Sequence, residues 1–435
     1  MRPRILIINP WIYDFAAFNF WSRPLGLLKI AEYLSGYDVD LFYIDCTDSF
    51  EVRQYGIGKF HAELVAKPAL LKSVPRHYKR YGMSIDEFKT KLKTFLPLDL
   101  VLMTSSMSYW YPGIQDTINF VRKFAGNVPV MLGGIYATLY RDHASRMSGA
   151  DYIYSGPLGD SFLTALQNFG IATFCARQPV PYYRLNFYPW FHFSPLLTST
   201  GCPFQCTYCA SQLLSHGYER NPVRDVVNEI QEFHSRGVRD FAFYDDALLY
   251  DPEHHIKPLL KKIIERGFFI RLHAPNGLHA RFIDDDLAQL MREAGFTTVR
   301  ISFETANSAR QKYTGDKVHT SDLVRSIRSL RKQGFTKEHI GVYLLYGLPG
   351  QGLSEVQESI AFLQGQKVRI YLAEFSPIRG TACWNDLVEN AIIPEDLDPL
   401  LTNNTVFSFL YSGYDQTTVK QIKRNVKDYN SRLEA

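Results

Sequence analysis

Three cysteines lie within one short segment, where Cys202, Cys206 and Cys209 have the spacing C-x3-C-x2-C. A structural zinc site is normally closed by four protein ligands, and this segment contains no fourth cysteine. A cubane of four irons that is held by only three thiolates keeps one iron without a protein ligand. Gly201 and Pro203 favour the tight turn that gathers the thiols. The spacing therefore predicts an iron–sulfur cluster with one open position, at which a ligand can bind and react.

Two plainer interpretations of the cysteines remain open: three buried structural residues, or a zinc site completed by a distant fourth ligand. The other cysteines, Cys46, Cys175 and Cys383, are scattered along the chain. This is not the pattern of a disulfide scaffold, and it favours a reducing compartment. The apolar run at residues 5–8 is too short for a signal peptide, and no apolar stretch reaches the length of a membrane span. We therefore expect a cytoplasmic protein without a membrane span.

The composition is that of an ordinary globular protein, with 46% hydrophobic and 21% charged residues. A length of 435 residues favours two domains over one core. The net charge of +4 is small for this length. A dedicated nucleic-acid binder would carry a more basic surface, so no nucleic-acid partner is expected.

Strand and helix patterns alternate in the first part of the chain. Four mainly apolar runs predict strands, at residues 5–8, 39–44, 100–104 and 128–132. Apolar strands that alternate with helices predict a parallel sheet covered on both faces. Residues 51–98 interrupt the alternation, and the patterns at 60–71 and 85–96 predict that this insertion is helical.

A second alternating array follows the cysteines. Its strands are predicted at residues 241–244, 269–273, 298–303, 342–346 and 370–375. With the strand before Cys202, this gives six β/α units, too few for a closed eight-stranded barrel. Function in such arrays belongs to residues at the carboxyl ends of the strands.

These patterns predict four segments along the chain. They are a first α/β domain at 1–172 with its insertion at 51–98, a linker rich in proline and aromatic residues at 173–195, a second α/β domain at 196–385, and a helical extension at 386–435.

The cysteine spacing, with Tyr208 directly before the last cysteine, resembles the radical S-adenosylmethionine (SAM) superfamily. The resemblance implies a [4Fe–4S] cluster held by Cys202, Cys206 and Cys209, whose open iron binds the amino and carboxylate groups of SAM. It implies that the reduced cluster cleaves SAM to methionine and a 5'-deoxyadenosyl radical, with electrons from a partner such as flavodoxin or ferredoxin. Tyr208 is then expected near the adenine, and the second array is expected to be the partial (β/α)6 barrel of TIM type found in this superfamily.

Polar residues end the second strand of this array. The resemblance implies that Asp245 and Asp246 attract the SAM ammonium group, which two adjacent carboxylates are suited to bind. For Asp246 the alternative is a cap of the following helix.

The later strand ends follow the order that the resemblance implies. Asn276 is expected to contact SAM or substrate. Ser302 and Glu304 end the fourth strand, and a glutamate there can accept hydrogen bonds from both ribose hydroxyls. Gly347 and Pro349 follow the fifth strand and are expected to shape the adenine pocket.

The first domain resembles the Rossmann-like cobalamin-binding domain that precedes many radical SAM enzymes. The matching positions expected to contact the cofactor are Ser105, Ser106, Gly133 and Gly134. The chain lacks the Asp-x-His-x-x-Gly motif that supplies an axial histidine in other cobalamin proteins. The bulky residues at 107–113 either form a floor under the corrin ring or fill its cavity, so cobalamin binding stays open.

The resemblance implies a radical SAM enzyme, with cobalamin-dependent methyl transfer to an unactivated carbon of a small molecule as the expected reaction. Without cobalamin, the expected reaction is a rearrangement, cyclisation or oxidation, and the first domain is empty. A cluster or corrinoid sensor without turnover is the alternative from another class, but a sensor needs no SAM site. RNA is not expected as a substrate, because only Cys46 lies in the first 150 residues and the C-terminal segment is predicted to be helical, unlike in methylthiotransferases.

Overall fold

The computed structural model describes residues 2–171, 174–182, 186–215 and 217–434. The chain divides into two compact units. Unit 1 is Met1–Phe191 with Asp398–Leu401, and unit 2 is His192–Leu397 with Thr402–Ala435. Residues 172–173 and 183–185, at the end of the predicted first domain and within the predicted linker, lie outside the described residues.

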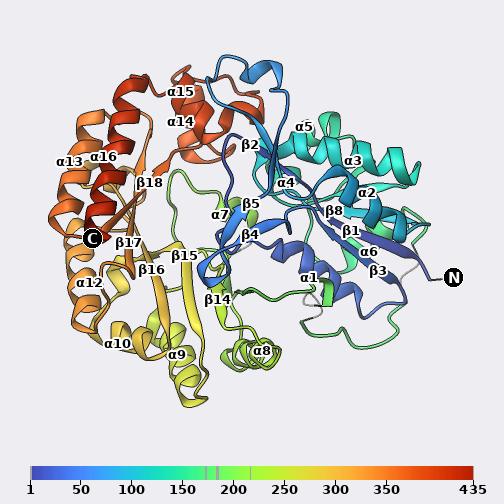
Figure 1. The fold of residues 1–435 in the computed structure, drawn as a ribbon, viewed down its shortest axis with the longest axis horizontal. Helices are drawn as coiled ribbons and strands as arrows, with labels where there is room; N and C mark the ends of the chain where they lie inside the picture. Colours follow the sequence, from blue (N-terminus) through green and yellow to red (C-terminus); the bar gives the residue numbers. More distant parts are fainter. Residues whose placement is uncertain (1, 172–173, 183–185, 216, 435) are drawn as a thin grey trace. The chain divides into compact units, whose positions relative to one another are not determined.

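Unit 1 is built on a five-stranded parallel sheet (Figure 1). Its strands are β1 (Arg4–Asn9), β3 (Asp40–Asp45), β8 (Leu100–Met103), β9 (Val130–Leu132) and β10 (Tyr152–Ile153), in the order β10-β9-β8-β1-β3. The predicted parallel sheet is confirmed, with the short β10 as an addition. The order reverses direction between β1 and β8, which is the point where ligands bind in open sheets of this kind.

Helices on both sides of this sheet explain its uniformly apolar strands. Helices α1 (Leu25–Leu34) and α6 (Asp160–Gln167) supply Leu27 and Phe162 to the same buried cluster as Ile5 and Ile7 of β1. Helices α2 (Ile85–Thr94) and α3 (Tyr111–Ala125) pack against each other. Burial on both faces requires apolar residues at successive positions of each strand.

The prediction that the insertion at 51–98 is helical is wrong for its first part. Residues 60–71 contain no α-helix but antiparallel strands, and only α2 matches a predicted helix. One small sheet joins β2 (Ile12–Asp14), β7 (Lys79–Tyr81) and β6 (Ala62–Leu64), and β4 (Phe50–Val52) pairs with β5 (Gly58–Phe60). The reason is a two-residue alternation, since Gly58 and Phe60 are buried while Lys59 is exposed, and Pro68 disfavours a continuous helix.

Unit 2 contains a six-stranded sheet whose strands follow one another in chain order, all parallel. They are β11 (Ser194–Leu196), β14 (Asp240–Phe243), β15 (Arg271–His279), β16 (Phe296–Glu304), β17 (Ile340–Tyr346) and β18 (Arg369–Glu374). The helices between them, which lie outside the sheet in Figure 1, are α8 (Val223–Ser235), α9 (Ile256–Glu265), α10 (Asp285–Glu293), α12 (Thr320–Lys332) and α13 (Leu353–Gly365). The six predicted β/α units are confirmed, and the sheet stays open because β11 and β18 do not pair.

Strand β15 is longer than predicted. It continues past His273 to His279, and its pairing with β16 shifts between Ala274 and Leu278. Asn276 therefore lies in an irregular part of the strand and not in a loop after it. Pro275 removes a backbone donor, which accounts for this break in the pairing.

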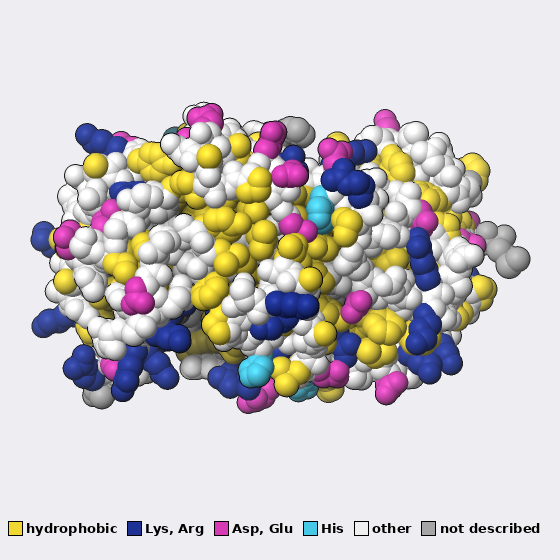
Figure 2. Space-filling model, turned by 90° about the horizontal axis from the view of Figure 1, so that it is seen from above, with side chains coloured by type: hydrophobic (Ala, Val, Ile, Leu, Met, Phe, Trp, Pro, Cys, Tyr) yellow, Lys and Arg dark blue, Asp and Glu magenta, His cyan; other side chains and the backbone are white. Residues whose placement is uncertain are grey.

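The chain ends in helices, as predicted: α14 (Ala382–Glu389), α15 (Asn404–Leu410) and α16 (Gln416–Glu434). Helix α16, drawn in red in Figure 1, contacts β18 and α13. Among the described residues, none of the helices combines the length and the apolar character needed to cross a membrane. On the face shown in Figure 2, Lys and Arg side chains are interspersed with Asp and Glu and do not form one continuous basic stripe.

Candidate active site

The cysteine segment follows β11 and leads into the short helix α7 (Ser211–Leu214). All three thiols are free and partly exposed. Gly201 begins the turn with φ +76°, and a Cβ atom there would lie 1.8 Å from the carbonyl oxygen of Gly217. Only glycine fits this backbone at this distance, so the turn that presents Cys202 depends on residue 201.

Hydrogen bonds fix the rest of the loop. The Gln212 side chain donates to the carbonyl oxygens of Cys202 (2.6 Å) and Phe204 (3.2 Å). The Cys209 amide donates to the Cys206 carbonyl at 3.1 Å. These contacts hold the backbone around the thiols through carbonyl oxygens, while Cys209 Sγ contacts the Ser211 hydroxyl at 3.3 Å.

Two distant residues complete the support of this loop, and the sequence did not indicate either. Gly315 packs so closely that a Cβ there would approach Cys206 Cα to 2.9 Å. Cys383, buried at the start of α14, donates its amide to the Thr207 carbonyl at 2.9 Å and contacts the Thr207 hydroxyl through sulfur at 3.4 Å. Cys383 is thus a spatial neighbour of the loop although it is far away in the sequence.

Replacing Gly201 with alanine should prevent normal cluster loading. The left-handed backbone costs an alanine about 1–2 kcal/mol, and the clash with Gly217 forces the turn to move. Gly217→Ala is the matched control, because Gly217 also has positive φ (+87°) but has no atom within 4 Å of the added Cβ. We expect iron and sulfide contents of purified Gly201→Ala below about half of those of Gly217→Ala. Equal contents in the two variants would show that the turn is not needed.

Two of the three thiols have raised pKa values, so their thiolate forms are unfavourable without a nearby cation. Burial raises the pKa of the Cys202 thiol to about 11, with the backbone N–H of Phe204 opposing the shift and Cys206 and Cys209 adding to it. Burial also raises the pKa of Cys206, and the ammonium group of Lys317 opposes this shift. Thiolates are the metal ligands, so a bound cation is what makes this charge favourable.

The donor set fits a cubane held by three thiolates. Within residues 2–171, 174–182, 186–215 and 217–434, no three His, Cys, Asp or Glu side chains converge on a position for one metal ion. A cubane does not require such convergence, since each thiolate binds a different iron atom. The fit rests on three neighbouring, partly exposed thiols on a loop whose backbone is held by other groups.

The two carboxylates after β14 have different surroundings. Asp245 is buried and accepts hydrogen bonds from the Thr198 amide (3.0 Å), the Thr198 hydroxyl (2.7 Å) and the Ser199 hydroxyl (2.7 Å). It therefore ties β14 to the chain that leads to the cysteines. Asp246 is exposed, and its charge acts on Cys202. Loss of hydration raises the pKa of the Asp246 carboxyl, and a hydrogen bond with Ser211 opposes that shift. Only Asp246 of this pair is open to a ligand beside the cysteines.

Glu304, Tyr208 and a residue missed in the sequence, Lys317, form one polar cluster. The Tyr208 hydroxyl donates to Glu304 Oε1 at 2.8 Å, and Lys317 Nζ lies 3.0 Å from the same oxygen. The side chains of Lys317 and Glu304 are 12% and 13% exposed. Burial lowers the pKa of Lys317, but Glu304, Cys206 and Cys209 more than offset this, so the net shift is upward and the amine stays charged.

Glu304 also has a strained backbone. Its φ is +68°, in the left-handed region that favours glycine, at the last position of β16. Strain of this kind costs about 1–3 kcal/mol and is concentrated at functional sites. The strain supports a functional role for Glu304, whose carboxylate faces Tyr208 and Lys317 in this structure.

Asn276 and Ser302 lie on neighbouring strands. Asn276 is exposed and donates to the Tyr244 carbonyl at 3.1 Å, which leaves its amide oxygen for a ligand. Ser302 is nearly buried, and a Cβ at Gly277 would lie 2.0 Å from its hydroxyl oxygen. Gly277 therefore permits the close approach of β15 to Ser302.

His279 lies under the cysteine loop. Its ring is 4.4 Å from that of Phe204, it is 4% exposed, and its Nδ1 has no hydrogen-bond partner among the described residues. Burial, with Lys317 and Arg281, lowers the pKa of His279 to about 3. The imidazole is therefore neutral at pH 7 and packs as a ring beneath the loop.

This burial gives a pH-dependent stability. The pKa of His279 is lower in the folded chain than the unfolded value of about 6.5, so the unfolded chain binds more protons below that value. Stability is complete above pH 6.5 and falls as the pH drops towards 3. Between pH 7 and pH 5, the free energy of unfolding of the wild type should fall by about 2 kcal/mol more than that of His279→Phe. Urea unfolding at both pH values measures this; parallel losses in wild type and variant would contradict it.

The loop after β17 is held by its own Gln351 side chain and by two side chains from other parts of the chain. Gly347 has φ +88°, and its amide donates to the Gln351 side chain at 2.9 Å. Arg310 donates to the carbonyl oxygens of Pro349 and Gly350, both at 3.0 Å, and Tyr414 donates to the carbonyl of Gln351 at 2.6 Å. Gly347 is buried and Pro349 is partly exposed, which gives a rigid wall at this strand end.

In unit 1, the predicted positions Ser105, Gly133 and Gly134 bind one another. The buried Ser105 hydroxyl donates to the Gly133 carbonyl at 2.6 Å, and its own carbonyl accepts the Ile135 amide at 2.8 Å. A Cβ at Gly134, which has φ +92°, would lie 2.3 Å from the Ser105 carbonyl oxygen. These residues shape the two loops, while Ser106 beside them is exposed.

The adjacent strands β8, β9 and β10 are each followed by an exposed apolar residue. These are Met107 (47% exposed), Ile135 (38%) and Leu158 (41%). Three exposed apolar side chains thus follow neighbouring strands of this sheet. Of the bulky residues after Met107, Tyr111 stacks on Tyr136 within unit 1, so it fills the interior.

At the other side of this sheet, the ends of β1 and β3 carry a buried charged cluster. Arg23 pairs with Asp48 at 2.6 Å and with Asp45 at 3.6 Å, and its guanidinium lies 3.8 Å from the centre of the Tyr188 ring. Asn9 donates to Asp45 at 2.7 Å. These partners satisfy the buried charges and fill this part of the strand ends.

Comparison with known proteins supports the organisation around the cysteines. Residues 196–363 match the model of the Radical SAM superfamily. An uncharacterized methyltransferase, PH0819, of Pyrococcus horikoshii is 25% identical over 220 residues, which are 49% of this chain and 46% of that protein. The ribosomal protein uS12 methylthiotransferase RimO of Bacteroides fragilis is 24% identical over 223 residues, 48% of this chain and 51% of that one. The chain thus matches about half the length of these relatives.

Two solved structures share the fold over most of the chain. The radical SAM methyltransferase TsrM of Kitasatospora setae, solved with tryptophan and a SAM analog, covers 89% of this chain and 76% of its own, with a TM-score of 0.64 and 17% identity. The cobalamin-dependent SAM radical enzyme OxsB covers 90% of this chain and 55% of its own, with a TM-score of 0.52 and 11% identity. The matched segment contains all three cysteines together with Asp246, Glu304 and Lys317, so this part of the chain is similar to the Radical SAM superfamily.

Proposed function

We propose that this chain cleaves SAM reductively and transfers a methyl group to an unactivated carbon of a small molecule, with cobalamin as a second cofactor. The observation that carries the proposal is the cysteine loop, whose three free thiols lie beside the exposed Asp246 and the Glu304–Lys317 pair. When bound, the cluster supplies the electron that cleaves SAM. A protein of the flavodoxin or ferredoxin type would reduce the cluster.

The chain's own residues divide the remaining work. Cys202, Cys206 and Cys209 would hold the cluster, and Asp246 is placed to attract the SAM ammonium group. Glu304 would accept hydrogen bonds from SAM hydroxyls, with Tyr208 and Lys317 holding its carboxylate in place. The rigid loop at Gly347 and Pro349 would form one wall of the nucleoside site. Fixed groups of this kind orient a cofactor before reaction, so little free energy is spent on rearranging the site during the reaction.

Cobalamin binding is supported by the apolar strand ends of unit 1. Met107, Ile135 and Leu158 offer an apolar surface, and Ser106 and Gly134 are exposed beside it. When bound, cobalamin would carry the methyl group. The fold shared with TsrM and OxsB agrees with this assignment.

A second candidate is a cobalamin-independent rearrangement, cyclisation or oxidation. One observation favours it. Ser105, Gly133 and Gly134 contact one another, and the Arg23 cluster fills the ends of β1 and β3, so these groups are not directed at a ligand. Unit 1 would then be a remnant without ligand.

One experiment separates these candidates. The protein is reconstituted anaerobically with iron, sulfide and hydroxocobalamin, desalted, and its visible spectrum is recorded before SAM and dithionite are added. We expect about one corrinoid per chain, and formation of 5'-deoxyadenosine and S-adenosylhomocysteine. Loss of the corrinoid with continued formation of 5'-deoxyadenosine supports the second candidate. No 5'-deoxyadenosine at all would contradict both and favour a sensor.

A further inference from the structure

Among the residues that the structure describes, no strand pairs with the outer edge of β18, the last strand of the sheet in unit 2. The Phe375 amide donates to the Tyr346 carbonyl, so odd-numbered residues of β18 point their backbone groups towards β17. Successive residues of a strand point to opposite sides. The backbone groups of Val368, Ile370, Leu372 and Glu374 therefore face the open edge.

Side chains of helix α16 pair with backbone groups only in the first half of this edge; beside the second half, Lys423 contacts the Glu374 side chain. Asn430 pairs with Ile370 like a strand residue, accepting from its amide at 3.0 Å and donating to its carbonyl at 2.8 Å. Tyr429 donates to the Val368 carbonyl at 3.1 Å. Among the described residues, nothing pairs with the edge-facing backbone groups of Leu372 and Glu374. The amides and carbonyls of these two residues are thus unpaired backbone groups of an edge strand, and they have the spacing that a further strand could pair with.

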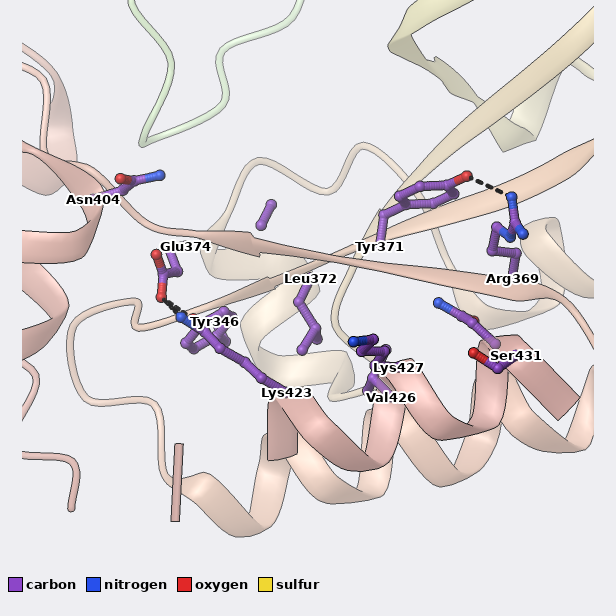
Figure 3. A pocket seen from close by; sticks show the side chains of 12 residues that line it. Tyr346, Arg369, Tyr371, Leu372, Glu374, Asn404, Lys423, Val426, Lys427 and Ser431 are labelled. Carbon is purple, nitrogen blue, oxygen red and sulfur yellow. Dashed lines mark hydrogen bonds and ion pairs between the residues drawn. The ribbon is translucent and has the colours of Figure 1, made fainter. Parts of the chain in front are cut away.

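The open groups line a groove with a volume of about 560 Å³, shown in Figure 3. Leu372 and Val426 form its apolar part, and Tyr346 and Glu374 close one end. This volume lies in the range of ligand-binding sites. Tyr346 and Glu374 are the last residues of β17 and β18, so the groove opens at the carboxyl ends of the strands, where the polar site residues also lie.

The charge of the groove favours an anionic occupant. Three cations line it, Arg369, Lys423 and Lys427, against one carboxylate, Glu374. Glu374 contacts both Lys423 and the Tyr346 hydroxyl. No ion pair joins Lys427 to any described residue, and its side chain is exposed.

We propose that this groove binds an extended acidic peptide segment, which pairs with Leu372 and Glu374 as a seventh strand. A peptide backbone supplies both the donors and the acceptors that the edge lacks, which a simple anion does not. Helix α16 runs antiparallel to β18, since Lys423 meets Glu374 while Asn430 meets Ile370. Lys423 and Lys427 are spaced about 6 Å along the helix, close to the roughly 6.7 Å between alternate side chains of a strand. Carboxylates at alternate peptide positions can therefore meet both lysines.

The bound segment would direct its end towards the strand ends that carry the candidate active site. That this segment is part of the substrate rests on the proposed methyl transfer but not on the proposed small-molecule acceptor, whereas the binding itself rests on neither. A peptide substrate would correct the expectation of a small molecule.

The test uses the whole reconstituted chain and fluorescence anisotropy. The probe is a fluorescein-labelled decapeptide of alternating Glu and Val, compared with a Lys/Val peptide and with a Glu/Val peptide methylated on alternate backbone nitrogens. We expect the Glu/Val peptide to bind at least about tenfold more tightly than either. Lys427→Glu should weaken its binding by about tenfold or more, while Lys420→Glu, the same charge change on an exposed residue of α16 outside the groove, should change it less than about twofold. Hydrogen exchange in residues 369–375 should slow when the peptide is bound.

Other outcomes overturn the inference. Equal binding of the Glu/Val and Lys/Val peptides, or equal losses in Lys427→Glu and Lys420→Glu, would remove the charge argument. Undiminished binding of the methylated peptide would indicate an anion site without strand pairing. Self-association abolished by Lys427→Glu would make a second copy the occupant. Measuring 5'-deoxyadenosine in the same samples separates the two proposals. Peptide binding without SAM cleavage would support the peptide groove and contradict the proposed function.

Discussion

Replacing Cys202, Cys206 or Cys209 with alanine is expected to abolish formation of 5'-deoxyadenosine from SAM. A cubane held by only two thiolates loses one of the three ligands that this loop provides. We expect rates below about 0.1% of wild type, which corresponds to a loss of more than about 4 kcal/mol in transition-state stabilisation. Product formation by mass spectrometry, together with iron content, measures this effect.

Cys383→Ala is the matched control for these variants. Cys383 touches the same loop through Thr207 but is buried beneath it, and its sulfur contacts the hydroxyls of Thr207 and Tyr313. Its replacement should cost about 1 kcal/mol of stability and leave the iron content unchanged. If Cys383→Ala lost iron as the other three do, the cluster would have a fourth protein ligand and no open iron.

Glu304→Gln is expected to weaken SAM binding by about tenfold or more while the cluster is retained. The substitution keeps the shape of the side chain but removes the carboxylate that accepts from Tyr208 and pairs with Lys317. It also leaves the Lys317 ammonium group nearly buried without its counter-charge, so stability should fall by roughly 2–3 kcal/mol. Equilibrium binding of SAM and urea unfolding measure the two effects separately.

The double variant Glu304→Gln with Lys317→Met distinguishes a functional from a structural role. Removing the unpaired ammonium group should restore most of the lost stability, because both charges are then gone. SAM binding should remain weak, because the carboxylate is still missing. Recovery of SAM binding in the double variant would mean that Glu304 only neutralises Lys317.

Much of the fold could be predicted because its signals are local. Uniformly apolar strands that alternate with amphipathic helices are typical of parallel sheets, and both sheets were predicted on this basis. The prediction of a helix at residues 60–71 was wrong. The strands there are only three residues long, so their two-residue alternation is a weaker sequence pattern than the apolar residues around it. The length of β15 was missed because Pro275 and Gly277 disfavour a strand, and only pairing with β16 keeps them in one.

The candidate site could be predicted only where a sequence motif marks it. The cysteine spacing identified the loop, and Glu304 was found as a polar residue at the end of an apolar strand. The sequence could not distinguish Asp245 from Asp246, since the difference between them lies in the hydrogen bonds from Thr198 and Ser199. Lys317 was missed because a loop between α11 (Ser308–Tyr313) and α12 brings it back to Glu304, and the nearby Gly315 was the only local sign of that tight packing.

The central claim is that this loop holds a cubane with one open iron, to which SAM binds. The most direct measurement combines iron and sulfide analysis of anaerobically prepared protein with electron paramagnetic resonance of the reduced sample, with and without SAM. We predict about four irons and four sulfides per chain and a [4Fe–4S]⁺ signal whose g values change when SAM is added. About one zinc per chain without acid-labile sulfide, or a cluster signal that SAM leaves unchanged, would contradict the account.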